Sequence, residues 1–471
     1  MIGTQSNPVQ HAEPAKIAEA LLHTHFRPPE KRPGLWTYQG AYYVWNADKW
    51  MIRDADWLRD TCWVLLEDLY VSRSVNGQVV AARYGVDSAK VSNVMEAITA
   101  KTRIPYTKIP CFLGRSEDID PECTISFENQ LVCVEGGNVV TLERDETYFD
   151  PIVVPCDYDP DAEYPVWAKC LDEWSGGDTQ WKELLQRWFG YCLLPHNRYA
   201  RWLLMYGKVR SGKGTIAKVL ESLLGLDAYI GTSLYSLSNR FGLDGLQSSR
   251  VLCVHEVSEL DSKDGERCTQ VLKSILGQDR IDIDRKGLSM VRNVTIDAKP
   301  MVQSNEIPRL PNKGQGLSSK MLLLPFDVSF LKKSDERLID KLRAELPGIA
   351  AWAVEGALKV EAETDTKARF PMPESSEEAI RLYLYTNNPF DSFLGARFIQ
   401  ADDGFVATEM IWRQWEHWID RNKVRGMHVS RNQLTVKLEQ ESTWNLRRYR
   451  PSGGQRGMRG LRLRSQYDDE E

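Results

Sequence analysis

The stretch Gly207 to Thr215, GKVRSGKGT, constrains the fold of this chain more than any other segment. Its spacing is that of a phosphate-binding loop, in which Gly-x-x-x-x-Gly-Lys is usually followed at once by a Ser or Thr that holds magnesium. Here Gly214 stands at the hydroxyl position, and the hydroxyl arrives one residue later, at Thr215. The apolar run RWLLMYG precedes the loop and the helical pattern TIAKVLESLLG follows it. This context predicts a nucleotide site in which Gly207 and Gly212 admit the phosphates and Lys213 reaches their oxygens.

The region around this loop, residues 176–346, alternates apolar strands with helices. The runs RVLCVHE, AKPMVQSNE and KMLLLPF are further candidates for buried strands. Alternation of this kind predicts an α/β fold with a parallel sheet that is covered by helices on both faces. Ligands of such a sheet lie at the carboxyl ends of its strands.

Two of these strands end in side chains that suit ATP hydrolysis. VLCVHE places Glu256 at a strand end, where a carboxylate can serve magnesium and the attacking water. PMVQSNE places Asn305 at the end of another strand, from which an amide can reach the γ-phosphate. The structural alternatives are a surface ion pair for Glu256 and a turn for Asn305. His255, at a position that is often acidic in motor ATPases, is interpreted as a polar residue with a partner in the fold.

The stretch DRIDIDRKGLSMVRNVTI, between these two strands, has the alternation of a hairpin with Arg285 and Lys286 at its tip. On this stretch alone, an exposed charged turn and a contact with a polyanion are equally compatible with the pattern.

Charge is distributed unevenly along the chain. The formal net charge is −6, but residues 421–464 carry 12 Lys or Arg against two Glu, a local charge of +10. Such a segment indicates a polyanion partner, with a solvated surface as the alternative. The helical patterns TEMIWRQWEHWIDR and SRNQLTVKLEQE precede two short basic strands around PSGGQRG, an order typical of a winged-helix DNA-binding module. The candidate DNA contacts in it are Arg447, Arg448, Arg456 and Arg459.

Composition excludes several other classes of protein. Apolar residues make up 42% of the 471 residues and charged residues 27%, which is ordinary for globular proteins. No apolar run approaches the roughly 18 residues of a membrane span, and the start lacks the apolar stretch of a secretory signal. The nine cysteines show no zinc-ligand spacing. We therefore expect a cytoplasmic protein, in a bacterial host or virus-infected cell, with reduced cysteines and no membrane partner.

The order and spacing of these motifs resemble the superfamily 3 helicases at the C-terminal end of phage, plasmid and large-virus primase-helicases. GKVRSGKGT is similar to their first motif, VLCVHE to the second and LKSILGQDRIDIDRKGLSM to the third, which forms a DNA-contacting hairpin. KPMVQSNEIPRLP resembles their sensor motif, and SSKMLLLPFDVSF the segment after it. VVPCDYDPDAEYPVWAKCLDEW resembles part of the helicase-associated domain, and the basic end resembles the terminal winged helix.

This resemblance implies an AAA+-like P-loop ATPase core with a mixed α+β N-terminal domain and a C-terminal winged helix. The domains expected on this basis are a polar arm (1–34), a helicase-associated domain (35–175), the ATPase core (176–346), a lid helix and connector (347–388), the winged helix (389–465) and an acidic tail (466–471).

The resemblance also implies a function: an ATP- and Mg²⁺-dependent replicative DNA helicase of a phage or mobile element. It would form a homohexameric ring and move 3′-to-5′ on the single strand of forked DNA. By position, the loop from Gly207 through Gly214 to Thr215 binds phosphate and magnesium, Glu256 serves magnesium and water, and Asn305 senses the γ-phosphate. In the hairpin, Arg285 and its neighbour Lys286 grip the DNA backbone.

Two departures from the family pattern affect this expectation. Lys320 stands where the family usually has the Arg that reaches into the neighbouring subunit's site. Lys keeps the positive charge but lacks the bidentate fork of Arg. Arg309, just past the sensor motif, is the other candidate for the residue that reaches the neighbouring site. The chain also offers no long N-terminal primase domain, so we expect any primase or polymerase to be a separate chain.

Two other functions remain open on the sequence. One is a DNA-binding replication initiator or regulator that uses ATP only to assemble, which Lys320 and the missing second acid favour. The other is a nucleoside or nucleotide kinase, because loops similar to GSGKGT occur in such enzymes. Kinase chemistry does not need the sensor strand, the cationic hairpin or the basic end. The kinase is therefore the least favoured of the three functions.

Overall fold

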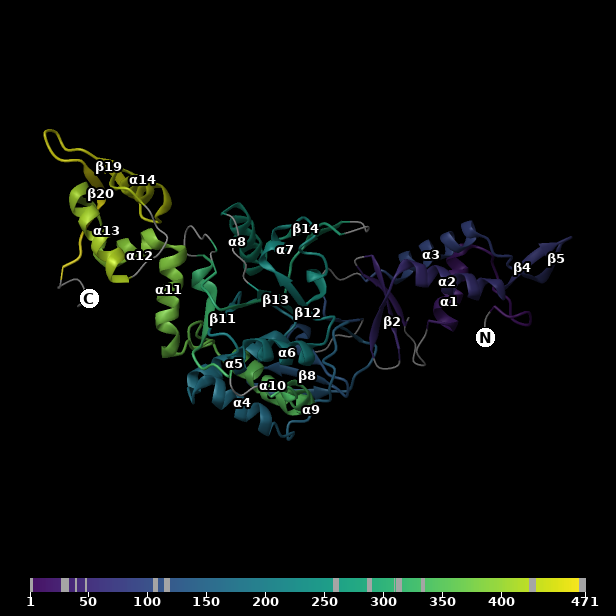
Figure 1. Cartoon of the computed structure of the whole chain (residues 1–471). Coiled ribbons are helices and arrows are strands. Elements are labelled where there is room, and N and C mark those ends of the chain that lie inside the picture. Colours follow the sequence, from purple (N-terminus) through teal and green to yellow (C-terminus); the bar gives the residue numbers. More distant parts are fainter. Residues whose placement is uncertain are drawn as a thin grey trace. The chain divides into compact units, whose positions relative to one another are not determined.

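The computed structural model describes most of the chain in two compact units, Met1–Pro160 and Asp161–Glu471 (Figure 1). The described residues are 3–26, 34–38, 40–46, 49–104, 109–113, 119–256, 262–285, 290–308, 310, 316–331, 335–422 and 429–465, with the backbone alone at 256, 262, 263 and 441.

The first unit is a mixed α+β domain whose strands pair antiparallel in small sheets. The strands form the sheets β1-β2-β3, β4-β5, β6-β10 and β7-β8-β9. The elements are α1 (Pro14–Thr24), β1 (Leu35–Tyr38), β2 (Ala41–Trp45), β3 (Trp50–Arg53), α2 (Ala55–Glu67), β4 (Tyr70–Val75), β5 (Gln78–Arg83), α3 (Ser88–Thr102), β6 (Cys111–Phe112), η1 (Pro121–Cys123), β7 (Thr124–Ser126), β8 (Leu131–Glu135), β9 (Asn138–Leu142) and β10 (Tyr148–Phe149).

Helices α1, α2 and α3 share one hydrophobic core. The Asp87 side chain caps α3 by accepting the Lys90 backbone N–H at 2.8 Å, and one face of α3 is buried at Val91 and Ile98. The N-terminal segment, expected to be a polar arm that leads into a helix, contributes Ile17 and the rest of the buried face of α1 to this core. Part of that segment is therefore packed within the first unit.

The second unit begins ahead of the expected boundary at residue 175, because α4 already belongs to it. Its elements are α4 (Pro165–Ser175), α5 (Thr179–Leu193), β11 (Trp202–Gly207), α6 (Lys213–Leu224), β12 (Tyr229–Ser233), α7 (Leu234–Ser238), η2 (Leu246–Ser248), β13 (Val251–Glu256), α8 (Ser262–Gly277), β14 (Ile281–Ile283), β15 (Val291–Val294), β16 (Lys299–Ser304), η3 (Ser318–Lys320), β17 (Met321–Phe326), α9 (Leu338–Ala344), α10 (Leu346–Ala362), η4 (Glu374–Ser376) and α11 (Glu377–Asn387).

A five-stranded parallel sheet in the order β12-β13-β16-β11-β17 forms the centre of this unit. Strand β11 lies between β16 and β17, so Leu204 pairs with Val302 on one side and Leu323 on the other. The prediction of a parallel sheet is confirmed. Since all five strands run the same way, their carboxyl ends meet at one edge of the sheet.

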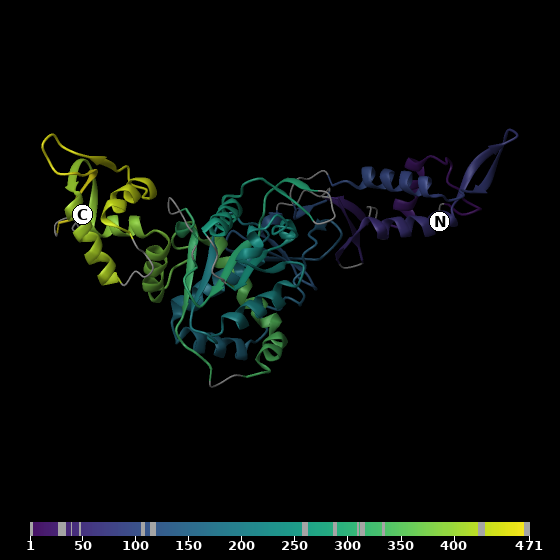
Figure 2. The same ribbon diagram turned by 45° about the horizontal axis from the view of Figure 1, so that its top comes forward.

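Helices cover both faces of the sheet (Figure 1), and the view in Figure 2 shows the same arrangement. Leu204, Val302 and Leu323 point to one face, where they share a hydrophobic cluster with residues of α7, α8 and α11. On the other face, α5 packs against β17: the Trp181 indole N–H donates to the Pro325 carbonyl at 2.9 Å, and the Trp181 ring meets that of Phe326 at 5.2 Å.

Helix α10, which the sequence suggested as a lid, packs tightly on α5. A Cβ added to Gly190 of α5 would lie 2.0 Å from the Ala357 backbone nitrogen, and one added to Gly356 of α10 would lie 2.1 Å from the Gln186 carbonyl oxygen. Two glycines thus let the helix backbones approach each other directly. This contact makes α10 part of the packed body of the unit.

The C-terminal part of the second unit has its own hydrophobic cluster around Phe393, Trp415 and Trp418. Its three strands form an antiparallel sheet in the order β18-β20-β19. Both expected helices and the expected basic strand pair are present, and a capping box of Ser430 and Gln433 begins the second helix. The elements are α12 (Pro389–Arg397), β18 (Phe398–Ala407), α13 (Thr408–Asn422), α14 (Arg431–Glu441), β19 (Arg447–Tyr449) and β20 (Gly457–Leu463).

No described helix has both the length and the apolar character needed to cross a membrane.

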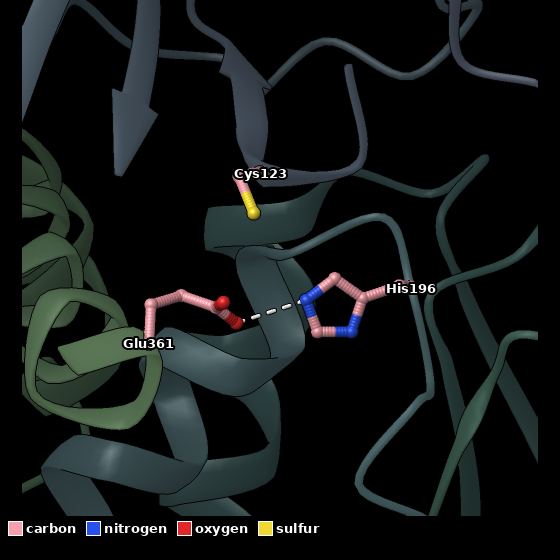
Figure 3. Close-up of side chains that lie close together, drawn as sticks. All are labelled: Cys123, His196 and Glu361. Carbon is pink, nitrogen blue, oxygen red and sulfur yellow. Dashed lines mark hydrogen bonds and ion pairs between the residues drawn. The ribbon is translucent and has the colours of Figure 1, made fainter. Parts of the chain in front are cut away.

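A buried polar pair ties the turn before β11 to α10. His196 Nε2 lies 2.9 Å from a carboxylate oxygen of Glu361, and both side chains are buried (Figure 3). Burial lowers the pKa of His196, as do the positive charges of Lys299 and Arg198, while the hydrogen bond with Glu361 opposes this shift. The fold therefore favours the neutral imidazole.

We expect the second unit to lose stability as the pH falls below about 6.5, the ordinary pKa of an unfolded histidine, because the unfolded chain then binds a proton that the folded His196 resists. The variant His196→Gln keeps a hydrogen-bond donor for Glu361 but cannot titrate. Its melting temperature should fall less than that of the wild type between about pH 7.5 and about pH 5.5. His417→Gln, at an exposed histidine, is the matched control. An undiminished pH dependence in His196→Gln would contradict this assignment.

Candidate nucleotide-binding site

The loop between β11 and α6 adopts backbone conformations that only glycine takes easily. Gly207 has φ 141° and Gly212 has φ 104°. A Cβ at Gly207 would lie 2.3 Å from the Phe326 carbonyl oxygen, and one at Gly212 would lie 2.6 Å from the Trp174 ring. Both glycines of the motif are therefore required by the backbone and by their neighbours.

Lys213, the first residue of α6, folds its side chain back into the loop. Its ammonium group donates to the carbonyl oxygens of Gly207 (2.9 Å) and Lys208 (2.6 Å) and to the Ser211 hydroxyl (3.2 Å). Burial lowers the pKa of Lys213 to about 8. A cation held beside the N-terminus of a helix, where backbone N–H groups lack partners, is an arrangement suited to binding phosphate.

A cleft of about 1650 Å³ opens at this loop. Loop residues 210–215 line one part of it, and the end of β16 with Gln303, Ser304 and Asn305 lines another. Residues of α4 and α9, His255 at the end of β13 and the segment after β17 also contribute to the lining. The cleft exceeds the roughly 300–1,000 Å³ of most small-molecule sites, so a nucleotide would occupy only part of it.

Several residues expected to act on ATP meet in this cleft. Lys213, Thr215 and Asn305 all line it, so the structure brings together the loop and the end of β16. Their roles remain predictions. Glu256 is the last residue of β13, beside Ser233 of β12 in the sheet register, but its side chain lies outside the described residues.

Sequence reasoning missed a polar network that faces the cleft. The Gln303 amide nitrogen donates to His255 Nδ1 at 3.1 Å and lies 3.3 Å from Cys253 Sγ. Both Gln303 and His255 line the cleft. The alternation of side chains along a strand could have indicated Gln303. It lies two residues before Asn305 and therefore on the same face of the sheet.

The oxygen atoms of this site suit magnesium in kind. Mg²⁺ prefers hard oxygen ligands, and the hydroxyl of Thr215 and the amide oxygens of Gln303 and Asn305 belong to that class. All three residues line the cleft that holds the loop.

Lys320, the first proposed trans-acting residue, does not line this cleft. The Lys320 ammonium group donates to the Leu276 carbonyl at 2.8 Å, near the end of α8. Arg309, its substitute candidate, lies outside the described residues.

The cationic hairpin is present as β14 and β15, which pair antiparallel. Arg285 Nε lies 3.5 Å from a carboxylate oxygen of Asp244, and the Arg285 side chain is 23% exposed. Arg285 thus has a partner within its own chain, whereas Lys286 lies outside the described residues.

The candidate DNA-binding arginines of the C-terminal part are exposed, but they differ in their partners. Arg448 pairs with Glu439 of α14. Arg447 and Arg459 lie opposite each other on β19 and β20, and the Arg459 guanidinium lies over the Tyr449 ring at 4.9 Å. Arg456, in the connection between the two strands, is also exposed.

The fold and the loop define the class: an α/β protein whose five-stranded parallel sheet is consistent with a P-loop ATPase core. The apo structure of the C-terminal region of NrS-1 has a similar fold, with 13% identity, a TM-score of 0.52 and coverage of 96% of this chain and 100% of that chain. A second structure of that region, residues 305–718, matches at 11% identity with a TM-score of 0.49 and the same coverage. At such identities the similarity concerns the fold alone.

Two sequence comparisons assign no activity, and the first of them falls on the core. Residues 205–318 match a family of unknown function, DUF5906. A segment of 94 residues, 20% of this chain, is 28% identical to the uncharacterized mitochondrial protein ymf21 of Marchantia polymorpha. The match spans about half the length of that relative, 52%.

We expect Gly207→Ala and Gly212→Ala each to lower the free energy of unfolding by about 1–3 kcal/mol, because each Cβ meets a fixed neighbour and each backbone has positive φ. Both should also weaken nucleotide binding. Gly214→Ala is the matched control, since a Cβ there would lie 3.9 Å from the Gln303 amide oxygen, an ordinary van der Waals contact. Denaturant unfolding of the three variants measures the difference. Equal losses in all three would contradict the assigned role of the loop backbone.

Proposed function

We propose that this protein is an ATP-driven DNA helicase that acts in the replication of a phage or other mobile element. The observation that carries the proposal is the cleft in which Lys213, Thr215 and Asn305 meet at the carboxyl ends of β11 and β16. The order of the other motifs along the chain supports a motor rather than a kinase, because a kinase has no use for the hairpin or the basic C-terminal part.

In this proposal the loop backbone and Lys213 bind the β- and γ-phosphates of ATP. On binding, the ammonium group exchanges the carbonyl oxygens of Gly207 and Lys208 for phosphate oxygens. Asn305 presents its amide to the γ-phosphate and to the attacking water. Thr215 and Glu256 are the residues that the family resemblance assigns to magnesium, which supplies charge neutralisation at the phosphates when bound.

The working form would be a homohexameric ring with single-stranded DNA in its channel, moving 3′-to-5′. Lys320 or Arg309 would act on the site of the neighbouring subunit. Lys320 must first leave the Leu276 carbonyl, which it binds in the single chain. Arg285 and Lys286 of the hairpin would then contact the DNA backbone.

The C-terminal part would bind forked DNA near the ring. Its order of elements, α12-β18-α13-α14-β19-β20, is compatible with a winged-helix module. The exposed Arg447, Arg456 and Arg459 supply positive charge on and near its strand pair. The protein would act in the cytoplasm of a bacterial host or virus-infected cell, with a primase or polymerase as a partner.

A second candidate function is a replication initiator that binds ATP mainly to assemble on DNA. The hydrogen bond from Lys320 to the end of α8 favours this function, because it makes Lys320 less available to a neighbouring subunit. Loss of a trans-acting cation slows ATP hydrolysis more than it weakens ATP binding. In that case the protein would bind duplex DNA tightly and unwind little.

We expect ATP hydrolysis to be stimulated by single-stranded DNA and to fall at least about 100-fold in Lys213→Ala, because the β- and γ-phosphates lose their cation. Steady-state phosphate release with and without DNA, together with unwinding of a labelled fork, provides the measurement. Lys367→Ala, at an exposed lysine remote from the loop in sequence, is the control. A rate of ATP hydrolysis that DNA does not change would contradict the proposal of a helicase. DNA binding without unwinding would favour the replication initiator.

We expect the double variant Arg447→Gln/Arg459→Gln to weaken DNA binding and to reduce the slope of log K against log salt by about 1–2, because each lost phosphate contact removes roughly 0.7–0.9. Arg448→Gln is the internal control, since Glu439 already neutralises that side chain. Fluorescence anisotropy at several salt concentrations measures the slope. If the double variant and Arg448→Gln behave alike, the strand pair is not the phosphate contact.

A further inference from the structure

Two positions that normally serve magnesium in a phosphate-loop site carry other residues in this chain. The loop hydroxyl is replaced by Gly214, and the strand-end position that is often acidic is occupied by His255. Thr215 does not simply substitute for the missing hydroxyl. Successive residues of an α-helix are rotated by about 100°, so the Thr215 side chain leaves α6 in a different direction from a side chain at 214.

Gln303 lies between these two positions. Its amide nitrogen donates to His255 Nδ1 at 3.1 Å and lies 3.3 Å from Cys253 Sγ. The His255 ring is itself seated over Gly231 of β12, where a Cβ would lie 2.5 Å from His255 Nε2. The ring therefore depends on a glycine for its place, and it orients the amide of Gln303.

With its nitrogen engaged in this way, the Gln303 amide presents its oxygen to the loop. A Cβ built on Gly214 would lie 3.9 Å from Gln303 Oε1, and apart from the adjoining residues and the backbone of α6 no other described atom lies within 4 Å. The Gln303 side chain is otherwise enclosed, with 7% of the residue exposed. The amide oxygen thus faces the space from which a Ser or Thr side chain would extend at position 214.

We infer that Gln303 Oε1 supplies the protein oxygen for the magnesium of the bound nucleotide, in place of the hydroxyl missing at Gly214. An amide oxygen is a neutral, hard donor of the kind Mg²⁺ accepts. His255 acts as the positioning residue, because its Nδ1 holds the amide nitrogen away from the metal. The inference rests on the proposed function in one respect: the cleft must bind a magnesium nucleotide.

The test is the gain in nucleotide affinity that magnesium provides. Binding of a fluorescent ADP is measured with Mg²⁺ and with EDTA for the wild type, Gln303→Leu, Gly214→Ser and the double variant Gln303→Leu/Gly214→Ser. We expect Gln303→Leu to reduce the Mg²⁺-dependent gain by about tenfold while affinity in EDTA stays close to that of the wild type. The double variant should recover most of the gain, because Gly214→Ser restores a hydroxyl where a Cβ has room.

Thr215→Val separates the inference from its main competitor. If Gln303 is the ligand, Thr215→Val weakens ADP binding to a similar degree with and without Mg²⁺. A loss of the Mg²⁺-dependent gain in Thr215→Val, with the gain intact in Gln303→Leu, would overturn the inference. Failure of Gly214→Ser to rescue Gln303→Leu would overturn it as well.

Manganese provides a readout that does not depend on nucleotide fluorescence or on turnover. Electron paramagnetic resonance of Mn²⁺ titrated into protein with ADP should show weaker Mn²⁺ binding in Gln303→Leu and recovery in the double variant. Unchanged Mn²⁺ binding in Gln303→Leu would contradict the inference. If the wild type binds no ADP in either buffer, the proposed function fails; if it binds ADP with a Mg²⁺-dependent gain that Gln303→Leu retains, this inference alone fails.

Discussion

Gly207 ends β11 directly beside Phe326, the last residue of β17, with no room for a side chain between them. The next residue, Lys208, donates its backbone N–H to the Phe326 carbonyl at 2.8 Å. The Phe326 ring lies 5.2 Å from the Trp181 ring of α5, and the Lys213 ammonium group lies 5.8 Å from the Phe326 ring. One buried residue thus joins the sheet, the covering helix, the start of the loop and its cation. The cleft depends on this contact because it fixes where the loop leaves the sheet.

From that point the sheet determines which side chains can meet the loop. Strand β16 lies beside β11, so Gln303 and Asn305 approach the loop from the neighbouring carboxyl end. Helix α4, from an earlier part of the chain, closes another side, and its Trp174 ring packs on Gly212. The same tryptophan that requires a glycine in the loop therefore also shapes the cleft. Packing and ligand access are decided by the same few contacts.

The sequence predicted those parts of the site that local pattern controls. The loop, the strand before it and the place of Asn305 follow from spacing and alternation, and the parallel sheet follows from alternating elements. The partners of Gln303, Lys320 and Arg285 could not be predicted in the same way, because each depends on contacts made only after the strands and helices have assembled. A helix was expected after the polar arm, but the packing of α1 into the core was not, for a related reason. Its buried face is short, and only the core it joins shows that it is not a free arm.

Strand β17 connects the cleft at the loop with the C-terminal end of α8. At its end, Phe326 holds the loop, and just before its start, Lys320 bonds to the Leu276 carbonyl at 2.8 Å. Helix α8 ends at Gly277, and the hairpin strand β14 begins at Ile281. The contact at the loop and the Lys320 contact therefore lie at the two ends of one buried strand of six residues, β17. One strand thus positions both the residue that holds the loop and the residue that bonds to the end of α8, from which the chain continues into the hairpin.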